Sequence, residues 1–251
     1  MLSGFDEISL AQLAIIAATA LVTSVVGGVA GYGTGALMPL VLVPIVGAEP
    51  VVPIISLSAL FINTSRAAAF RHLVDARRAL IVLASAVPTC VVGAWAYSKL
   101  SGRGALVVIG GMLIASVPLR RRMRRRGLAL SGRGLAAAAF GWGPLAGGTV
   151  GAGIILLSLL MAAGLEGAAV VATDAAISIG IGLAKFATFS LAGVVTAKVV
   201  MVALLIGAMA FPGAFVAKAL LERLPLHLHT ALLDAVVIGG GGVMIVNAFA
   251  N

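Results

Sequence analysis

Long apolar blocks make up most of the chain, and short groups of charged residues, glycine and proline separate them. A helix rises about 1.5 Å per residue, so about 20 apolar residues cross the ~30 Å hydrocarbon core of a bilayer. The blocks that match one crossing are residues 50–70, 79–98, 104–119, 166–192, 196–217 and 229–250. This pattern predicts an all-α fold, a polytopic bundle of transmembrane helices.

Two further blocks are too long for one crossing. As continuous helices, residues 8–47 would measure about 60 Å and residues 134–164 about 46 Å. Each block carries a glycine cluster near its middle, at residues 27–36 and 143–152. Because glycine interrupts membrane helices where the chain must bend, we expect both blocks to fold back at these clusters.

The two clusters are copies of one another. A shift of 116 positions places Gly27 on Gly143, and the same shift aligns Ala30, Gly31, Gly35 and Ala36 with Ala146, Gly147, Gly151 and Ala152. One inserted residue later, Gly47-Ala48-Glu49 meets Gly164-Leu165-Glu166. The sequence therefore predicts two homologous repeats, residues 1–119 and 133–251, joined by an arginine-rich cytoplasmic linker at 120–132.

Two arrangements of these repeats stay open. If each long block returns to its own side, the repeats are inverted, loops 71–78, 120–133 and 218–229 are cytoplasmic, and both termini lie outside. If each long block crosses once, the repeats run parallel. The excess of Lys and Arg in cytoplasmic loops fits both arrangements. We favour inversion because a 60 Å block must return and because the acidic pair Asp6-Glu7 then lies outside.

Composition excludes several classes of protein. The chain is 61% hydrophobic and 10% charged, with a mean hydropathy of +1.19, whereas soluble domains are about 45–50% apolar and about 25% charged. A soluble enzyme, a disordered tail and a disulfide scaffold, which a single cysteine cannot form, are excluded. The net charge of +9 is concentrated in the run Arg120–Arg126, which predicts a cytoplasmic anchor that also contacts anionic lipid. Nucleic-acid binding is not expected, because interleaved aromatic residues are missing.

The glycine clusters allow three interpretations. Residues 31–36 fit the dinucleotide fingerprint, but a membrane-grade apolar run precedes them and Ser56 stands where that motif needs an acidic residue. The four-residue spacing of Gly27, Gly31 and Gly35 suits close helix packing. The third interpretation, which we favour, is a pair of broken helices whose free N-terminal amides hold an anion near the midplane. Gly33 and Pro144 favour the break.

Three ionisable residues lie within or near the apolar blocks, where a charge is costly and indicates function. Lys185 is predicted to contact substrate or a counter-ion. Arg66 falls two residues from the equivalent position of the first repeat and either contacts the anion or extends to the cytoplasmic interface. Asp174 is a partner of Lys185, a proton-coupling carboxyl or a hydrogen-bonded core group.

Hydroxyl and amide side chains complete the predicted substrate site. Thr34 and Thr149 lie beside the free amides, and Ser56, Asn63, Thr173 and Ser178 lie in neighbouring blocks. The full prediction comprises Gly31, Gly33, Thr34, Gly35, Ser56, Asn63, Arg66, Gly147, Gly148, Thr149, Gly151, Thr173, Asp174 and Lys185. We expect no metal site, no cofactor and no enzymatic activity, because no cluster of metal-ligating residues and no nucleophile motif is present.

The glycine-rich segment 27–35, followed by residues 36–42 and Gly47-Ala48-Glu49-Pro50, and its second copy at 147–157 resemble the TauE/SafE family of bacterial membrane proteins. The resemblance covers the whole chain. It implies export of small sulfur-containing anions, such as sulfite, sulfoacetate or other organosulfonates, across the bacterial inner membrane by alternating access. The expected partners are a small anion, the lipid bilayer and, as an assembly, a homodimer. The alternatives are a non-transporting scaffold or accessory subunit and an anion channel.

Overall fold

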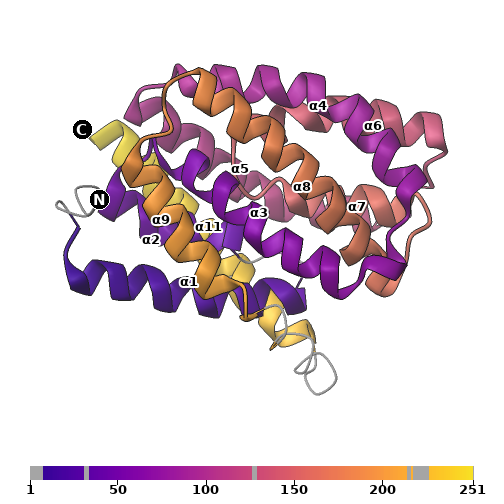
Figure 1. The fold of residues 1–251 in the computed structure, drawn as a ribbon, viewed down its shortest axis with the longest axis horizontal. Coiled ribbons are helices and arrows are strands. Elements are labelled where there is room, and N and C mark those ends of the chain that lie inside the picture. Colours follow the sequence, from indigo (N-terminus) through magenta and orange to yellow (C-terminus); the bar gives the residue numbers. More distant parts are fainter. Residues whose placement is uncertain (1–7, 31–33, 126–128, 214–215, 217–225, 251) are drawn as a thin grey trace.

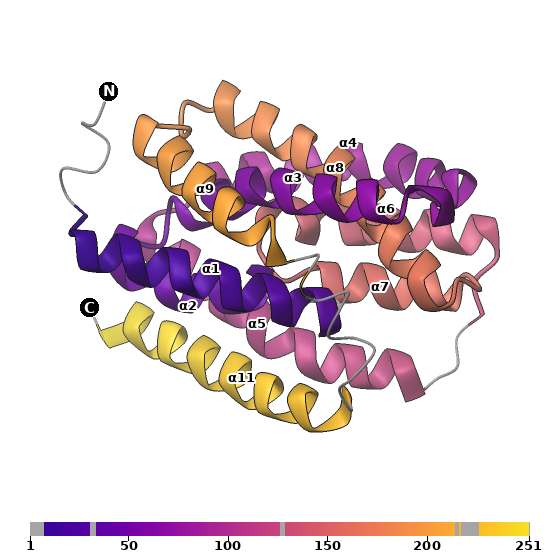
Figure 2. The same cartoon turned by 60° about the horizontal axis from the view of Figure 1, so that its bottom comes forward.

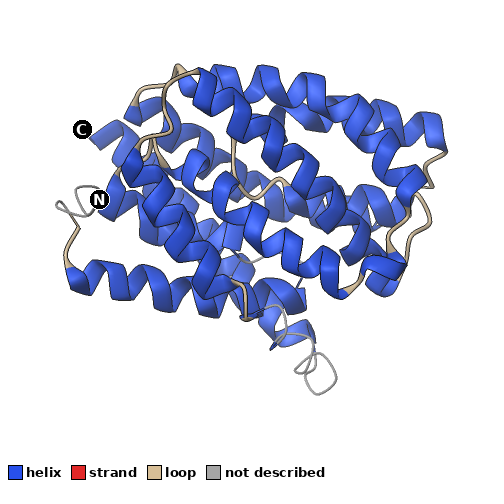
Figure 3. Cartoon of the chain, viewed as in Figure 1, coloured by secondary structure: helices blue, strands red, loops and turns tan. Residues whose placement is uncertain are grey.

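The computed structural model describes residues 8–30, 34–125, 129–213, 216 and 226–250. Within these ranges the chain is helical apart from short connections, and it contains no strand (Figure 3). The all-α prediction is confirmed.

The first half of the chain begins with two helices that pack against each other and continues with three more. These are α1 (Leu10–Ala30), α2 (Thr34–Val46), α3 (Val51–Ala69), α4 (Ala76–Ser98) and α5 (Gly102–Arg125), with a 3₁₀ turn η1 (Arg71–Leu73) before α4. The second half repeats this order with α6 (Gly132–Gly148), α7 (Gly153–Ala162), α8 (Gly167–Leu191), α9 (Ala197–Ala210) and α11 (Leu226–Ala250).

Four described helices are long and apolar enough to cross a membrane: α3, α4, α8 and the segment Gly102–Leu119 of α5. Shorter apolar helices, including α2, α7 and α9, fill the rest of the bundle. These spans support an integral, multi-pass membrane protein. The helix α5 continues past the predicted block end at 119 as far as Arg125, because arginine has a high helix propensity and gives the helix no reason to stop.

The helix α2, which follows α1, ends at one end of the bundle, and α7, which follows α6, ends at the opposite end (Figures 1 and 2). At one end, the Tyr97 hydroxyl donates to Ala48 O at 2.8 Å, which joins the α2–α3 turn to the end of α4. At the other end, Leu130 N donates to Ala162 O at 2.7 Å, which joins the start of α6 to the end of α7. The start of α1 and the end of α11 both lie at the first end (Figure 1).

The two halves interlock instead of forming separate lobes. The helix α4 packs against α6, α5 against α11, α3 against α8 and α1 against α9, so each of these pairs takes one helix from each half. If each helix is replaced by the one in the same position of the other half, the α4–α6 pair becomes the α9–α1 pair. The α3–α8 and α5–α11 pairs stay the same. The pairing of these helices is therefore unchanged when the two halves are exchanged.

Candidate functional site

The second glycine cluster contains a break between two helices. The helix α6 ends at Gly148, Thr149 is extended with φ −151° and ψ −172°, and α7 begins at Gly153. Gly151 has φ +81°, a left-handed conformation that glycine adopts without steric cost. The break leaves carbonyls at the end of α6 without partners inside their own helix. At the start of α7, Ile154 N donates to Gly151 O at 3.4 Å and Ile155 N donates to Ala152 O at 3.1 Å.

Lys185 of α8 lies at this break. Its ammonium donates to Ala146 O at 2.8 Å and to Thr149 O at 3.2 Å, and the residue is only 7% exposed. A cation at this position balances the negative end of the α6 dipole and satisfies carbonyls that the helix leaves free. An ammonium has three donors, so one remains for a further partner.

A pocket of about 130 Å³ opens beside the break, between α3, α6, α7 and α8. That volume holds several water molecules or a small oxyanion. Its polar lining comes from both halves of the chain: Ser56 and Asn63 of α3, Thr149 and the backbone of residues 150–153, and Ser178 and Lys185 of α8. Residues far apart in the sequence therefore form one small polar cavity in an apolar bundle.

Trp142 also lines the pocket and is a residue that the sequence analysis missed. Its indole Nε1 donates to Ala152 O at 2.9 Å, which fixes the segment between α6 and α7. The available signal was its position between Gly141 and Gly143. A buried indole needs an acceptor, and Ala152 O, which also accepts from Ile155 N, supplies it.

The glycines just before the break have a different environment. A Cβ on Gly143 would overlap Thr89 Oγ1, and one on Gly147 would overlap the backbone of Cys90. A Cβ on Gly148 would lie 3.0 Å from Gly93 O. These glycines allow α6 to approach α4 closely, as the packing interpretation predicts. Gly147 and Gly148 therefore face α4 and do not line the pocket.

The C-terminal end of the first glycine cluster contacts the second cluster. The helix α2 begins at Thr34, and a Cβ on Gly35 would lie 3.5 Å from Gly151 N. The first turn of α2 thus contacts the segment that precedes α7, although neither Thr34 nor Gly35 lines the pocket. Gly31 and Gly33 lie outside the described residues.

Arg66 and Asp174 form an ion pair between α3 and α8. Arg66 Nη1 lies 3.6 Å from Asp174 Oδ2, and the side chains are 12% and 6% exposed. Arg66 Nη1 also donates to Asn63 Oδ1 at 3.3 Å. Arg66 lies in the last turn of α3, and its side chain is directed to Asp174 of α8. The partner of Asp174 is Arg66 and not Lys185, which lies 11 residues farther along α8.

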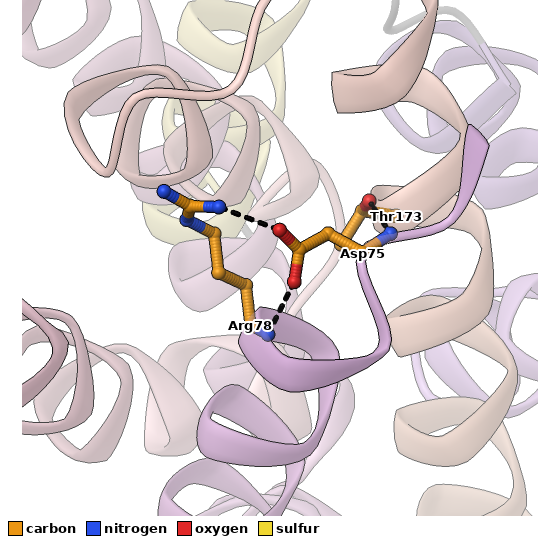
Figure 4. A network of polar contacts seen from close by, with 3 residues as sticks. All are labelled: Asp75, Arg78 and Thr173. Atoms are coloured by element: carbon orange, nitrogen blue, oxygen red, sulfur yellow. Dashed lines mark hydrogen bonds and ion pairs between the residues drawn. The ribbon is translucent and has the colours of Figure 1, made fainter.

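Thr173 anchors a turn and lies outside the pocket (Figure 4). Asp75 N donates to Thr173 Oγ1 at 3.0 Å, so the connection before α4 is attached to α8. Asp75 caps α4 by accepting from Arg78 N at 2.8 Å. This backbone hydrogen bond is the main reason why the pKa of Asp75 lies below its ordinary value, since it stabilises the carboxylate.

Comparison with known proteins identifies the family. A family profile described as "Sulfite exporter TauE/SafE" matches residues 16–247, nearly the whole chain. The chain belongs to the TauE/SafE family. No curated protein and no solved structure matches it. TauE/SafE proteins are membrane transporters of the sulfite-exporter type, so the scaffold interpretation loses its support.

In this TauE/SafE chain, five residues predicted for the substrate site line the same pocket: Ser56, Asn63, Thr149, Gly151 and Lys185. Arg66 does not line the pocket, but it donates a hydrogen bond to Asn63, which does. Asp174 contacts Arg66. Among the described residues, no group of three or more His, Cys, Asp or Glu side chains is placed to hold a metal ion. In this TauE/SafE chain the pocket presents hydroxyl and amide side chains and the ammonium of Lys185.

Proposed function

We propose that this protein transports small sulfur-containing oxyanions, such as sulfite, sulfoacetate or other organosulfonates, and that it binds them in the pocket beside the α6–α7 break. The observation that carries the proposal is the buried ammonium of Lys185 at the break, next to the N-terminus of α7. The family match supports the class of substrate.

Three kinds of donor suit a bound oxyanion. The third N–H of Lys185 supplies a charged donor, and the backbone amides of residues 151–153, which line the pocket at the positive end of α7, supply neutral ones. Asn63 accepts from Arg66 through Oδ1, so its Nδ2 is the atom left for the pocket. Ser56 Oγ donates to Val52 O, which leaves its oxygen as an acceptor for water or for a protonated oxygen of the substrate.

Alternating access follows from the arrangement of the halves. The pocket lies between α3 of the first half and α6, α7 and α8 of the second, and α2 and α7 end at opposite ends of the bundle. Motion of one half against the other about the α3–α8 contact opens the pocket to each end in turn. The halves are then inverted repeats.

Charge assigns the two ends to the two sides of the membrane. Arg71 lies in η1, Arg77, Arg78 and Arg133 lie in the first turns of α4 and α6, and Arg122 lies near the end of α5, all at one end of the bundle. Lys99, Arg103 and Lys198, at the end of α4 and the starts of α5 and α9, lie at the other end. The positive-inside rule therefore favours a cytoplasmic position for the end with η1. We also propose that the protein lies in a bacterial inner membrane, that Arg120–Arg126 bind anionic lipid, and that the protein forms a homodimer.

Flux of radiolabelled sulfite into proteoliposomes tests the function. We expect saturable flux for the wild type, a loss of about tenfold or more in Lys185→Met, since a charge-assisted hydrogen bond contributes about 1.5–3 kcal/mol, and no change in Lys99→Met. Lys99 is the matched control because it is an exposed lysine beside Trp95.

Other outcomes of this experiment separate the alternatives. Wild-type flux no greater than that of empty liposomes would support a scaffold and overturn transport. Flux that does not saturate would indicate a channel. Full flux in folded Lys185→Met would remove Lys185 from the site and leave transport standing.

A further inference from the structure

The Arg66–Asp174 pair is only partly satisfied. A buried arginine–carboxylate pair usually forms two parallel hydrogen bonds of about 2.7–2.9 Å, whereas one Arg66 nitrogen lies 3.6 Å from one Asp174 oxygen. Arg66 Nε, Arg66 Nη2 and Asp174 Oδ1 are buried and have no hydrogen-bond partner among the described residues. Unpaired buried groups are costly, especially at membrane depth, so a pair with a purely structural role would close these bonds.

The pair is one hydrogen bond away from the pocket. Asn63 lines the pocket and accepts from Arg66 Nη1, the same nitrogen that approaches Asp174. An anion on the Asn63 side of the pocket therefore competes with Asp174 for the guanidinium. Two unpaired nitrogens of Arg66 are available for that anion, because both lack a partner.

Loss of Arg66 to the anion leaves Asp174 buried with no countercharge. Lys185 cannot replace Arg66, because 11 residues along one helix separate it from Asp174 by about 16 Å. A buried carboxylate without a partner binds a proton in preference to remaining charged.

We propose that Asp174 is a proton-binding site coupled to the anion pocket, so that Arg66 moves to the bound anion while Asp174 takes up a proton. This inference rests on the proposed function. The proton adds to one carboxylate oxygen, Arg66 keeps its charge, and no bond is otherwise made or broken. A monovalent anion and its proton then occupy the site together with no net change in charge.

Other titratable groups on the elements around α8 do not provide this coupling. In η1, Arg71 and His72 are exposed. Before and on α4, Asp75 pairs with Arg78, Arg77 is exposed, and Cys90 packs against α6. Of the remaining elements, α6 carries Arg133 at its first turn, Glu166 precedes α8, and α7 carries no titratable residue. Arg66 of α3 is thus the described cation that contacts Asp174.

Calorimetric titration of the purified full-length protein with sulfite tests the proposal. Titrations at one pH in two buffers with different protonation enthalpies give the number of protons taken up per bound anion. We expect the wild type to take up about one proton more than Asp174→Asn, because Asn imitates the protonated acid and cannot accept a proton. Asp75→Asn is the matched control and should behave as the wild type.

Each outcome decides the proposal. Equal proton uptake in the wild type and Asp174→Asn would overturn it, as would loss of sulfite binding in folded Asp174→Asn. If Asp174→Asn does not fold, Arg66→Gln replaces it, and wild-type proton uptake in that variant would be the contrary result. A wild type that binds no sulfite would contradict the proposed function itself, whereas binding without the extra proton contradicts only the role of Asp174.

Discussion

The second glycine cluster has two parts that look alike in the sequence and differ in the structure. Gly143 and Gly147 lie within α6 and face the backbone or side chains of α4, where a Cβ has no room. Gly151 lies between α6 and α7, where a Cβ would make only ordinary contacts but the backbone has φ +81°. Gly143 and Gly147 are needed because they have no side chain, which lets α4 and α6 pack closely. Gly151 is needed because it adopts a left-handed backbone conformation.

This difference shows that regular glycine spacing does not by itself choose between close packing and a helix break. The packing part brings α4 against α6, and α6 must end beside α8 for Lys185 to reach Ala146 O and Thr149 O. The two interpretations of the cluster are therefore complementary. Substitutions that add one methyl group to each part separate their effects.

The largest effect is expected in the packing part. Gly147→Ala places a methyl group inside the backbone of Cys90, so α4 and α6 must move apart at a cost of about 3 kcal/mol. The melting temperature of the purified protein should fall strongly. Gly141→Ala is the matched control, because nothing lies within 4 Å of its Cβ position and alanine favours a helix by up to about 1 kcal/mol. Equal melting temperatures for the two variants would refute close α4–α6 packing.

A smaller effect is expected at the break. Gly151→Ala forces a left-handed conformation on alanine, which costs about 1–2 kcal/mol. We expect a modest loss of stability together with a several-fold loss of sulfite flux per folded protein, because this backbone lines the pocket. Gly193→Ala is the control, because Gly193 also has a positive φ, of +75°, has open space at its Cβ position and does not line the pocket. The same flux in both variants would show that the pocket does not depend on the break.

The smallest effect is expected at the cap of α4, which lies away from both groups of glycines and serves as a reference for loss of stability alone. Asp75→Ala removes the cap of α4 and should cost about 1 kcal/mol, with flux per folded protein unchanged. The pKa of Asp75 is lowered on folding, so its contribution is complete above the ordinary pKa of about 3.9 and is lost as pH falls through the folded value. The difference in melting temperature between Asp75→Ala and the wild type should therefore shrink in acid, and a constant difference from pH 7 to pH 3 would count against this cap.

Part of the site could be predicted from the sequence, because duplicated segments and interruptions of apolar blocks can be recognised without the structure. The excess length of residues 134–164 indicated the break, and the position of Lys185 deep in an apolar block indicated a functional charge. The shift that aligns Gly47 with Gly164 also places Ser56 on Thr173. In the structure, however, Ser56 lines the pocket, whereas Thr173 accepts from Asp75 N. Alignment of two positions in the sequence therefore does not give them the same neighbours.

The partners of the charges were beyond prediction for the same reason. Arg66 and Asp174 are separated by more than a hundred positions in the chain, and nothing local in either segment indicates that α3 and α8 pack together. The role of Trp142 depends likewise on Ala152 O, the carbonyl just before α7, which the fold brings back to α6.

By itself, the sequence determined the membrane-spanning helices, the need for two long blocks to turn back, and the family, because apolar length and residue order are properties of the chain alone. Tertiary structure alone decided which glycines pack and which break, that Lys185 balances the end of α6, and that Arg66 pairs with Asp174. Those outcomes depend on which helix faces are brought together, and a polar group buried in a bilayer takes whatever partner the facing helix presents.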